Sequence, residues 1–131
     1  MEMITVTPLY VALIALWMVV LSLRVAQTRR KYVVSLGDGG HDELNVRMRG
    51  FGNLIEYAPI ALLILLLLEL QSVSAMWLHI YGGVFLVLRV IHPLALYGQT
   101  KPTKLQKLGR MISAGGTMLL LLVGAVALLV S

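Results

Sequence analysis

The chain has 131 residues, of which 59% are hydrophobic and only 13% are charged, and its mean hydropathy is +0.88. Soluble domains are about half apolar and about a quarter charged, and a domain this short keeps too much surface to hide the excess apolar area from water. The composition therefore excludes an ordinary soluble domain and predicts a membrane protein. The net charge of +5 does not indicate nucleic-acid binding, because the cations flank apolar runs and form no continuous basic face with interleaved aromatic side chains.

Three segments are long and apolar enough to cross a bilayer, which takes roughly 20 residues. Residues 3–23 and 111–131 are uncharged, and residues 70–88 carry no formal charge. The other apolar block, residues 57–68, is too short alone, so its helix must extend N-terminally through Asn53 and Arg49. We therefore expect one all-α domain over residues 1–131, an integral membrane bundle of four transmembrane helices at about residues 4–30, 42–71, 74–98 and 104–130. Because residues 1–10 lack a basic region and a cleavage site, we expect the first helix to be retained and not removed as a signal peptide.

The positive charges are confined to one side of these predicted helices. All eleven Lys and Arg residues lie on or beside the first and third connections. By the positive-inside rule, these two connections are predicted to be cytoplasmic and both termini to lie outside. The cations are Arg24, Arg29, Arg30, Lys31, Arg47, Arg49, Arg89, Lys101, Lys104, Lys107 and Arg110.

Two local features bear on the helix ends. Asp42 follows a glycine-rich connection, and we expect its carboxylate to cap the second helix. Pro93 lies within the third helix and has no backbone N–H, so we expect the carbonyl of Arg89 to be unpaired or bonded to water.

The second helix carries the densest polar pattern. Arg49, Asn53 and Glu56 follow the spacing i, i+4 and i+7, which places them on one helical face, and Tyr57 widens that face. Polar side chains at membrane depth usually face a bundle interior and indicate function. Together they can hold a zwitterion, because arginine binds a carboxylate and glutamate an ammonium, while asparagine and tyrosine bind amides or a thiol. The structural alternative is an internal Arg49–Glu56 ion pair that offsets the cost of burial.

The third helix adds Arg89 and His92, with Tyr97 beyond them. Arg89 lies deep enough to need a partner, for which Glu56 is the natural candidate. His92 is either a hydrogen-bonded packing residue or a ligand-binding one.

Basic residues also stand at the ends of the first and last helices. Arg110 begins the last helix, and Arg29 and Arg30 end the first. They either close a basic pocket around an anion or only set the topology. The small residues at 113–117 indicate close helix packing. The chain has no cysteine, and its three histidines match no metal-ligand spacing, so we expect no metal site and any reactive thiol must arrive on a substrate.

Residues 49–59, with the sequence RGFGNLIEYAP, resemble the R-x-x-x-N-x-x-E-Y-x-P signature of the MAPEG proteins, the membrane-associated proteins in eicosanoid and glutathione metabolism. The length, the four spans, the R-R-K at residues 29–31, the R-x-x-H at residues 89–92 and the basic start of the last helix are similar as well. The segment VSLGDGG at residues 34–40 resembles the bacterial branch.

This resemblance implies a homotrimer of left-handed four-helix bundles in a bacterial inner membrane, with glutathione bound as cosubstrate between subunits near the cytoplasmic side. A lipophilic substrate would enter from the membrane lipid. Arg110 would stabilise the glutathione thiolate, and Arg30 or Arg29 would touch the peptide or an acidic acceptor. The resemblance assigns Arg110 and Arg30 to catalysis, and it assigns binding of glutathione to Arg29, Arg49, Asn53, Glu56, Tyr57, Arg89, His92 and Tyr97.

The implied activity is that of a membrane glutathione transferase or peroxidase acting on lipophilic electrophiles. Leu96 stands where the eicosanoid synthases often carry tyrosine, and Tyr97 is displaced by one residue, which weakens the match to an eicosanoid reaction. The alternative is a non-enzymatic scaffold of the same fold that binds a lipid or another ligand. A small multidrug-type exporter is disfavoured because it would place a carboxylate in the first helix, where only Glu2 precedes the span.

Overall fold

The computed structural model describes residues 3–131 and forms four helices, as the sequence predicts. They are α1 (Val6–Tyr32), α2 (Asp42–Leu70), α3 (Ala75–Ala95) and α4 (Lys104–Val130). Each helix is long and apolar enough to cross a membrane, and the described residues contain no strand. The expected all-α membrane architecture is confirmed. Glu2, on which the exporter alternative depends, lies outside the described residues.

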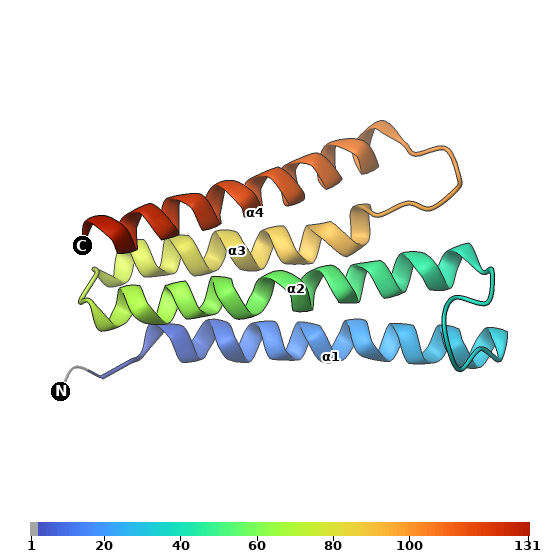
Figure 1. The fold of residues 1–131 in the computed structure, drawn as a ribbon, viewed down its shortest axis with the longest axis horizontal. Coiled ribbons are helices and arrows are strands. Elements are labelled where there is room, and N and C mark those ends of the chain that lie inside the picture. The colour runs from blue at the N-terminus through green and yellow to red at the C-terminus, as the bar shows by residue number, and fades with distance from the viewer. Residues whose placement is uncertain (1–2) are drawn as a thin grey trace.

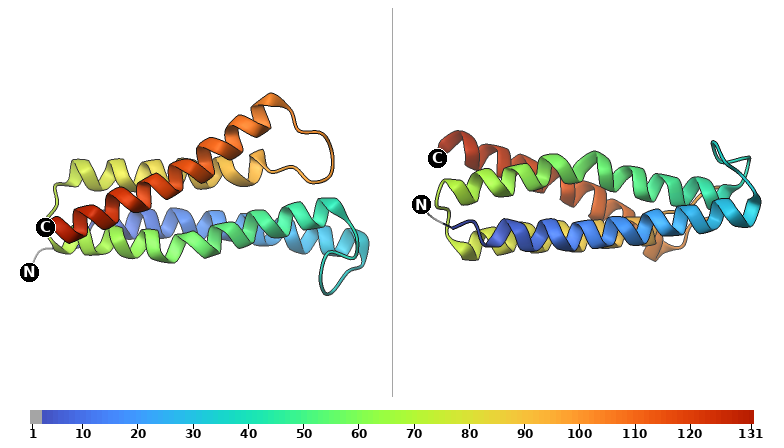
Figure 2. Two further views of the ribbon diagram at one scale, coloured as in Figure 1. Left: turned by 45° about the horizontal axis from the view of Figure 1, so that its top comes forward. Right: turned by 90° about the horizontal axis from the view of Figure 1, so that it is seen from below.

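The four helices lie side by side along one axis (Figure 1). The start of α1, the α2–α3 turn and the C-terminus share one end, and the two longer connections share the other, basic end. α4 crosses the bundle obliquely, so that its C-terminal end lies near α2 and its N-terminal end stands away from it (Figure 2). Among the described residues, α4 packs on α3 and α2 but not on α1. A pocket lies between α2, α3 and the start of α4, where α4 diverges from α2.

Apolar side chains from α1, α2 and α3 form the core in two clusters. One contains Tyr10, Leu65 and Tyr81 near the end that holds the termini, and the other contains Leu54 and Phe85 further along. α1 and α3 approach closely because residue 82 is glycine: a Cβ there would lie 2.5 Å from the Tyr10 ring. Many large apolar side chains on the outer faces are exposed in the single chain, as is expected for surfaces that meet lipid tails.

α2 is continuous from Asp42 to Leu70, which confirms that the short apolar block extends through polar residues. α3, in contrast, ends at Ala95 and not at the expected residue 98. Pro93 lies in its last turn, and the backbone becomes extended at Leu96. The early end releases residues 96–98 to line the space beside α4.

The expected cap at Asp42 is wrong. His41 is the N-cap of α2 and makes no side-chain cap bond, while Asp42 is already helical. Its carboxylate instead accepts a hydrogen bond from the backbone N–H of Gln99 at 3.0 Å. The carboxylate therefore fastens the α3–α4 connection to the start of α2. Gly98 permits this contact, because a Cβ at that position would collide with the Asp42 carboxylate.

The first turn of α1 is capped from another helix. The Glu69 carboxylate, at the end of α2, accepts hydrogen bonds from the backbone N–H groups of Thr5, Val6 and Thr7, each at 2.7 Å. A helix start leaves such groups without partners and carries partial positive charge, so a carboxylate there is doubly favourable. Glu69 thus joins α1 to α2 at the end opposite the basic connections.

We expect Glu69→Ala to lower the free energy of unfolding by about 1–2 kcal/mol, because three backbone donors lose a charged acceptor. Denaturant titration in mixed micelles measures this loss. Glu69→Gln keeps one acceptor oxygen and should lose clearly less stability than Glu69→Ala. Equal stability of all three proteins would refute the cap.

Candidate functional site

A pocket of about 240 Å³ lies at the basic end, between α2, α3 and α4. Its lining contains two arginines and no carboxylate. The pocket therefore favours a ligand that carries negative charge. The lining residues are Asn45, Val46, Arg49, Asn53, His92, Leu96, Tyr97, Gly98, Arg110 and Ala114.

Arg89 lies behind this pocket and is buried, with only 1% of its surface exposed. Its Nη1 donates to Asn53 Oδ1 at 2.5 Å, and its Nη2 donates to Ser113 O at 3.0 Å and to Thr117 Oγ1 at 2.5 Å. The guanidinium also lies 5.4 Å from the centre of the Tyr57 ring, within the range of a cation–π contact. The structure therefore uses Arg89 to join α2, α3 and α4.

The expected Glu56 partner of Arg89 is wrong. Glu56 lies on the outer face of α2, where its Oε1 is 3.6 Å from Arg49 Nη1. Neutral acceptors on α2 and α4 replace the carboxylate. The two acceptors on α4, from Ser113 and Thr117, are one helical turn apart (i and i+4).

The bond to Arg89 also fixes the orientation of the Asn53 amide. A guanidinium is only a donor, so the atom of Asn53 that faces it must be the oxygen. The amide NH₂ group is then left for the pocket that Asn53 lines. Asn53 therefore adds hydrogen-bond donors to the pocket, as do the two arginines that line it.

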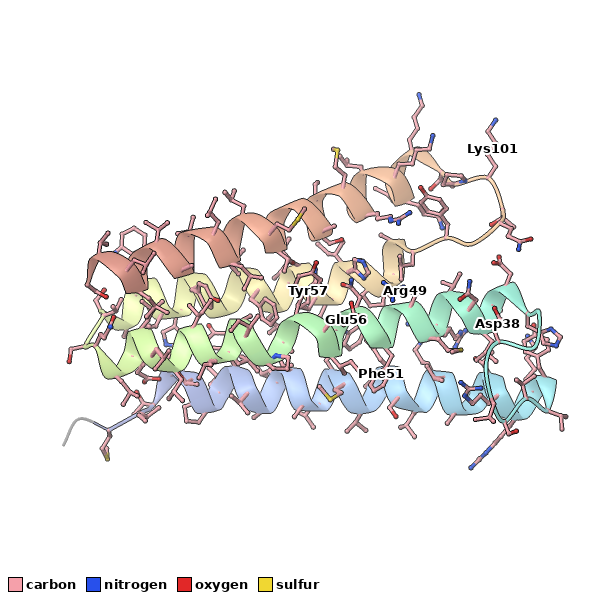
Figure 3. All side chains as sticks on the ribbon, viewed as in Figure 1. Asp38, Arg49, Phe51, Glu56, Tyr57 and Lys101 are labelled. Carbon is pink, nitrogen blue, oxygen red and sulfur yellow. The ribbon has the colours of Figure 1, made fainter. Side chains whose placement is uncertain are left out.

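The Arg49–Glu56 ion pair forms, but it lies on the surface of the single chain and is not buried inside the bundle. The two side chains are 59% and 58% exposed, and Glu56 stands midway along α2. Figure 3 shows Arg49 and Tyr57 on the side of α2 toward α3, and Phe51 on the side toward α1. A half-exposed ion pair at membrane depth is costly against lipid, so this face of α2 requires a polar or protein neighbour.

His92 and Arg110 complete the pocket from α3 and α4. His92 is buried, and its Nδ1 has no hydrogen-bond partner among the described residues. The Arg110 guanidinium lies 5.5 Å from the centre of the Tyr97 ring, which holds the cation at the pocket by a cation–π contact. One buried imidazole and one ring-held cation are therefore available to a ligand.

Comparison with known proteins agrees with this arrangement. Residues 7–130 match the MAPEG family. The chain belongs to the MAPEG family. It is similar to the inner membrane protein YecN of Escherichia coli strain K12, with 39% identity over 87 residues that make up 66% of each chain, and equally to YecN of Escherichia coli O6:H1. The match thus spans slightly less than two thirds of the length of these relatives. No solved structure matches this chain. Its four apolar helices and these relatives make it an integral membrane protein of the MAPEG family.

Five of the predicted site residues meet in the pocket of this MAPEG protein, and the others lie elsewhere. Arg49, Asn53, His92, Tyr97 and Arg110 line it. Glu56 lies on the outer face of α2, and Tyr57 and Arg89 lie behind the pocket, in contact with each other.

Arg29 and Arg30 do not line this pocket. Arg29 Nη1 donates to the carbonyls of Val34 and Gly37 at 3.4 and 2.8 Å and so fastens the first connection. Arg30 is exposed at the end of α1. Their contact with a ligand stays a prediction.

Sequence reasoning missed several residues around the pocket. Asn45 lines it, while Ser113 and Thr117 accept from Arg89. Ser113 accepts through its backbone carbonyl, which no residue type marks, so only the Thr117 hydroxyl leaves a signal in the sequence, within a segment that predicted only close packing. The expectation for Pro93 is also wrong: the carbonyl of Arg89 accepts a hydrogen bond from Trp17 Nε1 at 3.1 Å.

Proposed function

We propose that this MAPEG protein is a membrane glutathione transferase or peroxidase that acts on lipophilic electrophiles or lipid hydroperoxides. The observation that carries the proposal is the pocket of donors, with two arginines and the Asn53 amide NH₂ in a lining without a carboxylate. Glutathione brings two carboxylates and a thiol that becomes an anion when it reacts. Guanidinium groups bind carboxylates in a bidentate manner and favour the ionised form of a nearby thiol.

Arg110 is the proposed catalytic residue. A free thiol has a pKa of about 8.5 and is only a few per cent ionised at neutral pH. A guanidinium beside the sulfur favours the thiolate, and each unit of pKa shift corresponds to about 1.4 kcal/mol. The thiolate then attacks the electrophilic carbon, forming a C–S bond while the leaving group departs as an anion, and the thiol proton passes to solvent. In the peroxidase reaction, two glutathione molecules reduce a hydroperoxide to an alcohol and water and are oxidised to the disulfide.

The remaining ligand contacts follow from the chemistry of the lining. Arg49 binds a glutathione carboxylate, Asn53 donates to its peptide backbone, and His92 and Tyr97 close the pocket. Glu56 holds the ammonium group, which has no partner inside the pocket itself.

The site is completed by a second copy of this chain. The pocket of about 240 Å³ is smaller than the roughly 300–1,000 Å³ of ordinary ligand pockets, and the Arg49–Glu56 pair is half exposed at membrane depth. A homotrimer would cover that pair and add the exposed Arg30 of a neighbouring subunit to the ligand. Lys101, which points away from the bundle (Figure 3), takes no part.

The proposal includes an orientation in a bacterial inner membrane. The pocket lies at the end that carries the two basic connections. By the positive-inside rule this end faces the cytoplasm and both termini lie outside. The lipophilic acceptor reaches the thiolate laterally from the bilayer, and glutathione reaches it from the cytoplasm.

The test is conjugation of glutathione to chlorodinitrobenzene by the purified protein. Asn53→Ala removes an amide donor from the pocket and the acceptor of Arg89, so we expect kcat/KM to fall by about tenfold or more. Lys101→Ala, at the same end but outside the pocket, should keep the wild-type rate. A measured wild-type rate that Asn53→Ala leaves unchanged would place the reaction elsewhere.

One observation favours a second function, a non-enzymatic lipid-binding scaffold. An apolar crevice of about 370 Å³ lies between the end of α3 and the start of α4, lined by apolar residues such as Leu94 and Leu108. It can hold an acyl chain without any glutathione. Calorimetry discriminates the two functions: binding of a fatty acid with no binding of glutathione would support the scaffold.

A further inference from the structure

The carbonyl of Arg89 has an unusual hydrogen-bond partner. In a regular helix this carbonyl would accept from the backbone N–H of the residue four positions later, but that residue is Pro93, which has no N–H. The indole Nε1 of Trp17 donates to it instead, at 3.1 Å. Trp17 lies in α1, the helix that does not contact α4. A side chain of α1 therefore replaces a missing backbone bond of α3.

Packing on both partners fixes the geometry of this bond. The Trp17 ring packs against the apolar cluster that contains Ile14, Leu54 and Phe85. Pro93 is buried and packs against α2 at Gly50, where an added Cβ would lie 3.0 Å from the Pro93 Cβ. The last two turns of α3 are thus held by α1 through a hydrogen bond and by α2 through close contact.

These two turns carry a side chain that orients a pocket residue and one that lines the pocket. Arg89, whose carbonyl receives the indole bond, orients the Asn53 amide. His92 lies one residue before Pro93 and lines the pocket, as do the residues that follow the early end of α3. A change in the tilt of these turns would therefore move groups that line the pocket, although Trp17 itself does not line it.

We propose that Trp17 is a positioning residue of the pocket: its indole N–H supplies the hydrogen bond that Pro93 cannot make and so holds in place Arg89, which orients Asn53, and His92, which lines the pocket. The part of this inference that concerns glutathione rests on the proposed function. The part that concerns pocket geometry does not.

The first experiment observes the hydrogen bond itself. The chain has two tryptophans and three histidines, so NMR of protein labelled with ¹⁵N at these side chains gives few signals, and Trp77→Phe and His92→Gln assign them. Pro93→Ala returns an N–H to position 93, which competes for the Arg89 carbonyl. We expect the Trp17 indole proton to move to higher field in Pro93→Ala while the Trp77 signal stays. An unmoved Trp17 signal would overturn the proposal.

The second experiment tests positioning with a double-mutant cycle. Trp17→Phe keeps an aromatic ring and removes the N–H. In protein that keeps proline at position 93 (the Pro93 background), we expect this substitution to shift the His92 ring signals and to raise the glutathione Kd by about tenfold. In the Pro93→Ala background the carbonyl has a backbone donor, so Trp17→Phe should change neither quantity by more than about twofold. Trp77→Phe is the matched control, because Trp77 is exposed.

The outcomes separate this inference from the proposed function. If Trp17→Phe has the same effect in both backgrounds, it acts through ring packing and the proposal is wrong. If it leaves both the His92 signals and the Kd unchanged in the Pro93 background, Trp17 does not position the pocket. If the wild-type protein binds no glutathione, the proposed function fails, and the His92 signals alone then decide whether Trp17 holds the pocket.

Discussion

Arg89→Ala is expected to lower the free energy of unfolding by about 3 kcal/mol, the largest loss of stability that we predict for a single side chain. The substitution leaves a cavity between three helices, and it removes the donors to Asn53, Ser113 and Thr117. Glutathione binding should fall as well, because the Asn53 amide loses the contact that orients it. Denaturant titration in mixed micelles at one protein concentration measures the stability.

Two variants identify the cause of this loss. Arg89→Met refills much of the volume without donating, so it should recover part of the stability but not glutathione binding. Arg30→Ala removes an exposed cation from the same end of the bundle and should change stability by less than about 0.5 kcal/mol. Wild-type stability of Arg89→Ala would show that the buried guanidinium does not hold α2, α3 and α4 together.

Arg110→Ala is expected to reduce kcat for glutathione conjugation at neutral pH by about 10–100-fold, because the bound thiol loses the cation that favours its ionised form. The thiol of bound glutathione should then titrate near its free pKa of about 8.5. A raised pKa means less thiolate at pH 7, so the rate of the variant should climb as the pH rises from 7 to 9. The wild-type rate should already be near its plateau.

The measurement is the pH–rate profile at saturating glutathione. Lys107→Ala is the matched control, because Lys107 lies on α4 one turn before Arg110, is exposed and does not line the pocket. Its profile should superimpose on that of the wild type. If Arg110→Ala merely scales the wild-type profile down at every pH, Arg110 does not act on the thiol.

The fold was predictable because its determinants are local. Each helix is marked by an apolar run of sufficient length, and the one short run, residues 57–68, could span only by extending through Asn53 and Arg49, which α2 does. The family signature also lies within α2, at residues 49–59. The error at the start of α2 arose because an aspartate beside a helix start can either cap that helix or bond to another segment. Asp42 reads as a cap by residue type, yet its carboxylate bonds to Gln99.

The candidate site was predictable only in part, because helical periodicity shows which residues share a face but not what lies opposite. The spacing of Arg49, Asn53 and Glu56 places them together, yet only Arg49 and Asn53 line the pocket. The oblique crossing of α4 brings Ser113 and Thr117 to Arg89, so neutral oxygens replace the expected carboxylate. The Trp17 bond joins residues 72 positions apart, a separation that no local pattern encodes.

Isothermal titration of glutathione into the purified protein tests most directly whether the donor-lined pocket binds glutathione. We predict saturable binding by the wild type. Arg49→Ala, which removes a bidentate carboxylate contact, should weaken the affinity by about tenfold or more, and Lys101→Ala should leave it unchanged. Absence of binding by the wild type, or equal affinity of Arg49→Ala and the wild type, would contradict this prediction.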